Sequence, residues 1–220
     1  MKGKTTRTPR TKPWHPLAWQ TQSLLLAYPD DRPGPRLDLA RRAAAALPCE
    51  ISDPLLRFIL HTERTSADVL AAAYVETFDH RKRCCPYLTY YAHGDTRRRG
   101  VALLRLKQTY TAAGWRLVDD ELPDHLAVVL EFAATDPAAG ARLLTEHRAG
   151  LELMRLALAD DGSPWADVLV SVSATLPPLT GDDRKAVMRL AAQGPPEEQV
   201  GLDPYAQTQF LPDPVVGGPR

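Results

Sequence analysis

Residues 74–134 decide the fold, and they read YVETFDHRKRCCPYLTYYAHGDTRRRGVALLRLKQTYTAAGWRLVDDELPDHLAVVLEFAA. Two blocks stand out within this stretch: GDTRRRG at residues 94–100 and ELPDHL at residues 121–126. The stretch mixes charged and aromatic residues with helix-start and helix-end signals, and it holds no complete catalytic motif. This combination indicates a helical protein that recognises a partner rather than one that catalyses a reaction.

Helix signals follow one another along this stretch. Asp95 or Thr96 is expected to cap a helix over residues 97–113, and Gly114 follows it where a left-handed residue commonly ends a helix. The LPD turn at residues 122–124 predicts the start of another helix. The apolar positions of that helix follow the i, i+3, i+4, i+7 spacing of a buried face: Leu126, Val129, Leu130 and Ala133.

The same signals recur on both sides of the stretch, and alternating strands joined by hairpin turns are not evident. Four start signals are the Asp53-Pro54 and Asp136-Pro137 pairs and the capping boxes at residues 65–68 and 180–183. Further helices are expected over residues 17–27, 35–47, 55–63, 67–78, 87–92 and 136–159, after residue 164, and from residue 180 to Gly194. The fold class is therefore all-α, a single helical-bundle domain of roughly nine helices.

The domain is expected to cover residues 14–194. Residues 1–13 are Lys, Arg, Thr and Pro-rich and are expected to form a disordered arm. Residues 195–220 are expected to form a Pro/Gly-rich tail. Because the tail contains Tyr205, Phe210 and Leu211, docking of the tail onto the domain is an alternative.

Composition narrows the possible classes of function. The 220 residues include 27 basic and 27 acidic side chains, so a global attraction to nucleic acid or to an anionic membrane is not expected. Three cysteines, two of them adjacent, do not form a disulfide framework and favour a reducing compartment. The sequence shows neither a targeting segment nor a run of about 20 apolar residues, so the expected location is the cytoplasm, without membrane insertion.

Candidate catalytic and metal-binding residues do not form a known constellation. Cys84-Cys85 lacks the CxxC spacing of a zinc site, and residues 121–125 read ExxxH rather than HExxH. A GxSxG nucleophile motif is also absent. His125 beside Asp124 and Glu131 has two readings: a hydrogen bond at a helix start, or a contact whose strength is tuned by titration. We therefore expect that the protein is not an enzyme and binds no metal.

Four segments together resemble the NarJ family, the nitrate reductase delta subunits that act as molybdenum cofactor assembly chaperones. They are YVETFD at residues 74–79, YLTYY at 87–91, GDTR at 94–97 with Arg99-Gly100, and ELPDHL at 121–126 with LEF at 130–132. The segment QTQSLLLAYP at residues 20–29 also looks like the opening helix of that family. The resemblance covers roughly residues 19–176 and is absent from the arm and the tail.

The resemblance implies an all-helical redox-enzyme maturation chaperone without catalysis of its own. Such a chaperone binds the apo form of the molybdenum-containing catalytic subunit of respiratory nitrate reductase, partly through the N-terminal segment of that subunit. It holds the client until molybdenum cofactor insertion and iron–sulfur assembly are complete, before the complex docks at the membrane. No cofactor is expected to stay bound to it. The alternatives are an accessory enzyme or binding protein acting on the cofactor, and a stable structural subunit of the reductase.

A helical client segment would lie in an apolar groove between helices. The candidate lining residues are Tyr87, Tyr90, Tyr91, Leu126 and Leu130. The candidates that would pair with client charge at the rim are Arg97, Arg99, Asp124, His125 and Glu131. The sequence alone leaves the position of the groove open.

Overall fold

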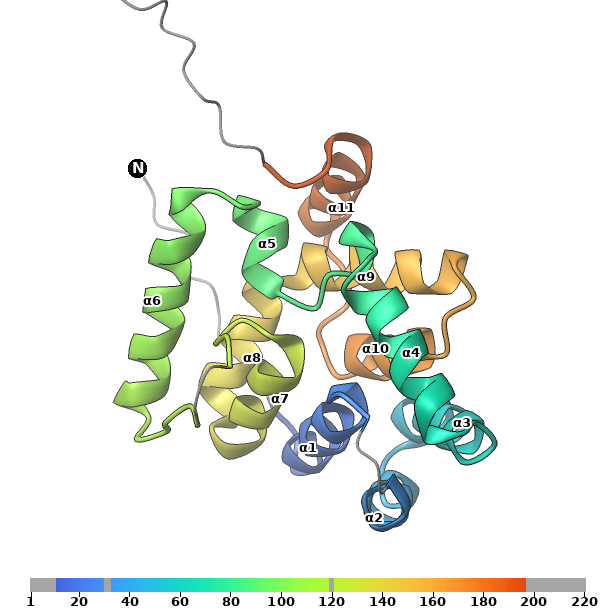
Figure 1. Cartoon of the computed structure of the whole chain (residues 1–220). Coiled ribbons are helices and arrows are strands. Elements are labelled where there is room, and N and C mark those ends of the chain that lie inside the picture. The colour runs from blue at the N-terminus through green and yellow to red at the C-terminus, as the bar shows by residue number, and fades with distance from the viewer. Residues whose placement is uncertain (1–10, 30–32, 119–120, 197–220) are drawn as a thin grey trace, which may run out of the picture.

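The computed structural model describes residues 11–29, 33–118 and 121–196. These residues form eleven α-helices and one short 3-10 turn, arranged as a single bundle (Figure 1). In chain order the helices are α1 His15–Leu26, α2 Pro33–Ala45, α3 Cys49–Glu63, α4 Ala67–Phe78, α5 Leu88–His93, α6 Arg97–Ala112, α7 Leu126–Thr135, α8 Pro137–Glu146, α9 Arg148–Asp160, α10 Trp165–Ala174 and α11 Gly181–Gln193, with the turn η1 Lys82–Cys84 before α5. The predicted all-α class is confirmed.

Helix α1 lies at the centre of the packing, against α7, α2 and α10. Its buried face carries polar side chains as well as apolar ones, and these form hydrogen bonds to other helices. Gln22 donates from Nε2 to Ser171 Oγ at 2.9 Å, and Trp19 donates from Nε1 to Thr175 Oγ1 at 3.0 Å. Ser171 in turn donates to the backbone oxygen of Ile51 at 2.9 Å, so one chain of bonds joins α1, α10 and α3.

Two aromatic clusters fill the core at opposite ends. Trp165, only 1% exposed, packs against Phe58, Tyr74 and Phe78, with ring centroids 5.4–5.8 Å apart. The second cluster, Tyr110, Trp115 and Phe132, fixes α6 against α7. Figure 1 shows α6 at the opposite edge of the molecule from α3 and α4. Aromatic side chains bury the most apolar area per residue, so these clusters set the positions of the outer helices.

Several predicted helix ends are confirmed. Helix α4 spans the predicted residues, although Ser66 makes no side-chain cap bond, so the capping box expected there is absent. The capping box at α11 is present: Thr180 Oγ1 accepts from the backbone of Asp183 at 3.2 Å, and Asp183 accepts from the backbone of Thr180 at 2.8 Å. Gly114 has the expected positive φ of 74°.

Two predicted helix boundaries are wrong. Helix α3 begins at Cys49 instead of residue 55, and it runs through Pro54. The backbone oxygen of Pro48 accepts hydrogen bonds from the backbone nitrogens of Ile51 and Ser52, both at 2.9 Å. A proline inside a helix removes one backbone donor, and here the packed helix tolerates that loss. The single helix expected over residues 136–159 is two helices, α8 and α9, separated at His147.

Candidate functional site

The starts of α5 and α7 lie side by side, although 37 residues separate Leu88 from His125 in sequence. Their backbones pair as a short antiparallel bridge between Tyr87 and His125. The Leu88 nitrogen donates to Asp124 O at 2.9 Å, and the Leu126 nitrogen donates to Pro86 O at 2.8 Å. The bridge joins the YLTYY and ELPDHL blocks into one structural unit.

Asp124 is the buried anchor of this unit, because its residue is 0% exposed. Its Oδ2 accepts from the Thr89 backbone nitrogen at 3.3 Å and from the Thr89 hydroxyl through a short hydrogen bond, and it lies 3.6 Å from Arg99 NH2. Its Oδ1 has no hydrogen-bond partner among the residues that the structure describes. A buried carboxylate is stable only where donors and a counter-charge replace water, and Thr89 and Arg99 supply both.

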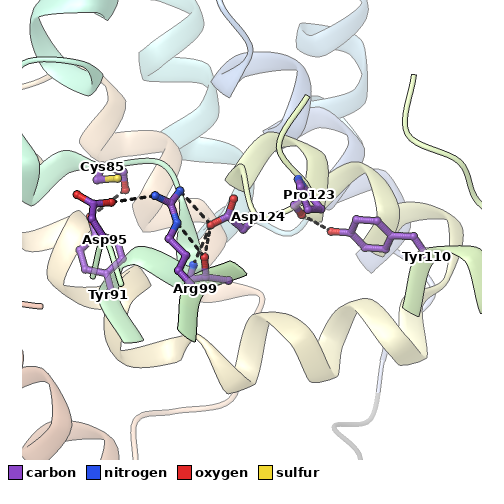
Figure 2. A network of polar contacts seen from close by, with 8 residues as sticks. Cys85, Tyr91, Asp95, Arg99, Tyr110, Pro123 and Asp124 are labelled. Atoms are coloured by element: carbon purple, nitrogen blue, oxygen red, sulfur yellow. Dashed lines mark hydrogen bonds and ion pairs between the residues drawn. The ribbon is translucent and has the colours of Figure 1, made fainter. Parts of the chain in front are cut away.

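Arg99 connects α6 to this anchor. Figure 2 shows its guanidinium between Asp95 and Asp124, with Asp95 Oδ1 at 3.1 Å from NH1. The guanidinium also lies 5.4 Å from the centre of the Tyr87 ring, within the range of a cation–π contact. Nearby, the Tyr110 hydroxyl donates to Pro123 O at 2.6 Å and fixes the turn before α7 (Figure 2). Asp95 and Arg99 of the GDTRRRG block are therefore used within the fold.

His125 caps α7. Its Nδ1 accepts from the Ala127 backbone nitrogen at 3.3 Å, so the hydrogen bond at a helix start is the confirmed reading. The ring packs edge-on against Tyr87, with centroids 5.4 Å apart. Burial lowers the pKa of the imidazole, while Asp124 and Asp79 oppose that shift. The ring is consequently neutral at pH 7, and since Nδ1 accepts, Nε2 carries the proton.

A surface hollow of about 400 Å³ lies beside this unit, at the end of α1. We call it the Tyr87–His125 hollow. Its aromatic and apolar lining comes from Tyr28, Tyr74, Tyr87, Leu122, His125 and Val128, with Glu121 and Glu131 among its polar residues. Tyr28 is 55% exposed and Leu122 is 40% exposed, so apolar surface here faces solvent. Burial, and to a lesser extent the neighbouring Glu121, raise the pKa of Glu131, so two carboxyl groups interact on this side of the hollow.

The structure brings only part of the predicted site together. Tyr87, His125 and Glu131 line the hollow. Leu126 and Leu130, expected as lining residues, are 1% and 0% exposed and belong to the core beneath it. The periodic apolar stripe of α7 is a core face, which is the ordinary role of such a stripe.

The rim residues are also redistributed. Asp124, expected to meet client charge, lies below the surface and pairs with Thr89 and Arg99 instead. Arg97 is exposed at the start of α6 and does not line the hollow. Tyr90 and Tyr91 line a different hollow, where the Tyr91 ring is 2% exposed. Client contact by any of these residues stays a prediction.

Sequence reasoning missed eight of the lining residues, and the larger aromatic and aliphatic ones among them are Tyr28, Tyr74, Leu122 and Val128. Two of them carried a signal, because Tyr28 ends the QTQSLLLAYP segment and Leu122 lies in the ELPDHL block. Tyr74 lies on an apolar face of its helix that the sequence pattern assigns to the core, and Val128 lies outside the apolar stripe predicted for its helix. Their place in the lining of the hollow depends on where α1 ends, and local sequence does not report that.

The described residues include neither a cluster of metal ligands nor a helix suited to crossing a bilayer. Within residues 11–29, 33–118 and 121–196, no group of three His, Cys, Asp or Glu side chains could hold a metal ion. Burial raises the pKa of both the Cys84 and the Cys85 thiol to about 11, so neither is a ready thiolate ligand or nucleophile. Over the same part of the chain, none of the helices has the length and apolar character needed to cross a lipid bilayer.

The fold matches a known structural class. A crystal structure described as a redox enzyme maturation protein from Archaeoglobus fulgidus superimposes with a TM-score of 0.55, over 78% of this chain and 98% of that one. Only 22% of aligned residues are identical, so this likeness concerns the fold alone.

Sequence comparison gives the family. The nitrate reductase delta subunit model matches residues 43–171, and the chain therefore belongs to the nitrate reductase delta subunit family. The molybdenum cofactor assembly chaperone NarJ of Escherichia coli is 30% identical over 204 residues, covering 89% of this chain and 85% of that protein. The NarJ of Bacillus subtilis is 33% identical, over 73% of this chain and 88% of its own length. The nitrate reductase-like protein NarX of Mycobacterium tuberculosis is 38% identical over 174 residues, which are 79% of this chain and only 26% of NarX.

Proposed function

We propose that this chain is an assembly chaperone for a respiratory nitrate reductase. It binds the apo form of the molybdenum-containing catalytic subunit in the cytoplasm, including the N-terminal segment of that subunit. It holds the client until molybdenum cofactor insertion and iron–sulfur assembly are complete, and then leaves before the enzyme docks at the membrane. The family membership and the names of the NarJ relatives support this proposal.

The observation that carries the proposal is the Tyr87–His125 hollow. Tyr28 and Leu122 expose apolar surface there, while Asp124 and Arg99 of the neighbouring blocks are already engaged in contacts within the fold. This arrangement suits docking of a side chain or a helix turn rather than chemistry, because it offers neither a reactive thiolate nor a free nucleophile–base pair. The chaperone itself is proposed to keep no cofactor.

The contacts within the hollow suggest how a client segment binds. Tyr28, Leu122 and Val128 offer an apolar wall for one face of an amphipathic client helix. The neutral His125 ring can donate from Nε2 to a client carbonyl oxygen. Glu121 and Glu131 favour a client with a Lys or Arg beside its apolar face, because a cation there offsets their mutual repulsion.

The buried anchor shapes the hollow without touching the client. The Asp124–Thr89–Arg99 contacts hold the starts of α5, α6 and α7 together, and Arg99 packs on the ring of Tyr87. Tyr87 and His125 are therefore oriented before the client arrives. Such preorganisation lowers the entropy cost of binding. Because release must follow maturation, we expect an affinity near micromolar, about 8 kcal/mol of binding free energy.

Isothermal titration calorimetry with a peptide from the N-terminus of the catalytic subunit tests this proposal. We expect Leu122→Ala, at a position 40% exposed in the hollow, to weaken binding about fivefold or more. The matched control is Leu104→Ala on α6, 56% exposed and outside the hollow, which should bind like wild type. Equal affinity for all three proteins would place the client elsewhere.

A further inference from the structure

A second hollow, of about 600 Å³, lies between α5, α9 and α11. We call it the α5–α9–α11 hollow, and it shares no lining residue with the Tyr87–His125 hollow. Its apolar wall is formed by Tyr90, Tyr91, Leu153, Leu156, Ala157 and Leu190. Leu156 is 38% exposed, so part of this wall is open to solvent. Apolar side chains that line a concave surface and are partly open to solvent form a candidate binding site.

The described chain ends on the wall of this same hollow. Pro195 and Pro196 are lining residues, and Pro196 is the last residue that the structure describes. At Gly94, where φ is 57°, a Cβ atom would overlap the carbonyl oxygen of Pro196. Only glycine permits that approach, and it holds the end of the described chain against the loop between α5 and α6. Residues 197–220 therefore start directly beside the open wall.

The composition of residues 197–220 suits this position. They contain the apolar side chains Tyr205, Phe210 and Leu211, and their charged groups are four carboxylates and one arginine. Lys82 and Arg83 are exposed lining residues of the hollow, and in sequence the acidic pair Glu197-Glu198 directly follows Pro196. Asp95 and Asp160 lie there too, but Asp95 is already paired with Arg99. The segment and the hollow thus match in apolar surface and largely in charge.

We propose that the C-terminal segment, residues 197–220, folds back and occupies the α5–α9–α11 hollow, with Tyr205, Phe210 and Leu211 on its apolar wall. The nine residues from Pro196 to Tyr205 span up to about 30 Å, which is ample for a wall that begins at Pro196. A tethered segment acts at an effective concentration on the order of 1 mM. With an intrinsic dissociation constant of about 0.1 mM, about nine molecules in ten would be docked. The docked segment covers apolar surface that would otherwise bind other proteins.

Hydrogen–deuterium exchange tests this proposal on three proteins: the full chain, a chain ending at Pro196, and full-length Tyr205→Ala/Phe210→Ala/Leu211→Ala. We expect backbone amides of α5 and α11 to exchange about tenfold faster in both variants, because docking restricts local opening. Amides of α3, remote from the hollow, should not change. A synthetic peptide of residues 197–220, added to the shortened chain, should restore protection as its concentration rises.

A charge placed on the wall provides the reciprocal variant. Leu156→Asp should release α5 and α11 as the tail variants do, whereas Leu104→Asp on the outer face of α6 should not. Unchanged exchange in the triple alanine variant would overturn the proposal, even if the shortened chain fails to fold. Protection of α5 and α11 by the catalytic-subunit peptide, with no effect of the tail, would also overturn it and assign this hollow to the client. Client binding at the Tyr87–His125 hollow is measured separately, so either proposal can fail alone.

Discussion

Replacing Asp124 by alanine tests the structural role of the buried anchor. The substitution removes the acceptor of two Thr89 donors and the partner of Arg99, whose side chain is 19% exposed. Thr89 is 1% exposed, so water cannot replace these bonds without opening the fold. Each buried donor left unpaired costs about 1–3 kcal/mol, and breaking a buried ion pair costs about 3–5 kcal/mol. Because these terms overlap and Arg99 keeps Asp95, we expect a loss of about 3–4 kcal/mol.

Urea unfolding followed by far-UV circular dichroism measures this loss. With a slope of about 2 kcal/mol per molar urea, the midpoint should fall by about 1.5–2 M. Asp95→Ala is the matched control, because it removes the other carboxylate that pairs with Arg99. The Asp95 side chain is 74% exposed, so its loss should cost at most about 1 kcal/mol. If Asp124→Ala lost no more stability than Asp95→Ala, the buried carboxylate would not be an anchor and the reasoning would be refuted.

Two further predictions concern His147, which separates α8 from α9, and the glycines at positions 150 and 100. Burial lowers the pKa of His147 to about 4. The free energy of unfolding should therefore decline by up to about 3 kcal/mol as the pH falls from 6.5 toward 4, because the buried ring must then be protonated. Urea unfolding at several pH values should show a smaller decline for His147→Gln. Gly150→Ala should destabilise by about 1–3 kcal/mol, because its Cβ would lie 2.8 Å from Tyr91 Cβ. Gly100→Ala, in α6, should stabilise the protein by about 0.5–1 kcal/mol, because an added Cβ would have no atom within 4 Å. A higher melting temperature for Gly150→Ala than for Gly100→Ala would contradict this reading.

The sequence predicted the fold class and many helix ends because those depend on local signals. Thr180 and Asp183 lie within one turn of each other, so their capping box can be recognised without tertiary information. The break between α8 and α9 at His147 was missed because local signals do not report tertiary packing. The apolar stripe continues across it, while α8 packs on α7 and α9 packs on α10 and α11. Periodicity records which side is buried, and it does not record a change in helix direction.

The site was harder to predict because exposure depends on distant partners. Asp124 resembles a surface helix-start carboxylate, and only Thr89 and Arg99, 35 and 25 residues away, make its burial possible. Leu126 and Leu130, by contrast, follow the core spacing that the sequence already displayed. Tyr87, His125 and Glu131 were predicted as residues of one client groove, although local pattern alone does not bring them together. The structure gives the physical link between them, the bridge between Tyr87 and His125.

The central claim is that this chain acts on a nitrate reductase catalytic subunit before its cofactor is inserted. The most direct test is the molybdenum content of that subunit, purified from cells that carry the wild-type chain, no chain, Leu122→Ala with Tyr28→Ala, or the control Leu104→Ala. We predict full molybdenum content with the wild type and the control, and a severalfold deficit in the other two cases. The finished enzyme should not contain the chain. Equal molybdenum content in all four cells, or stoichiometric retention of the chain in the finished enzyme, would contradict the account.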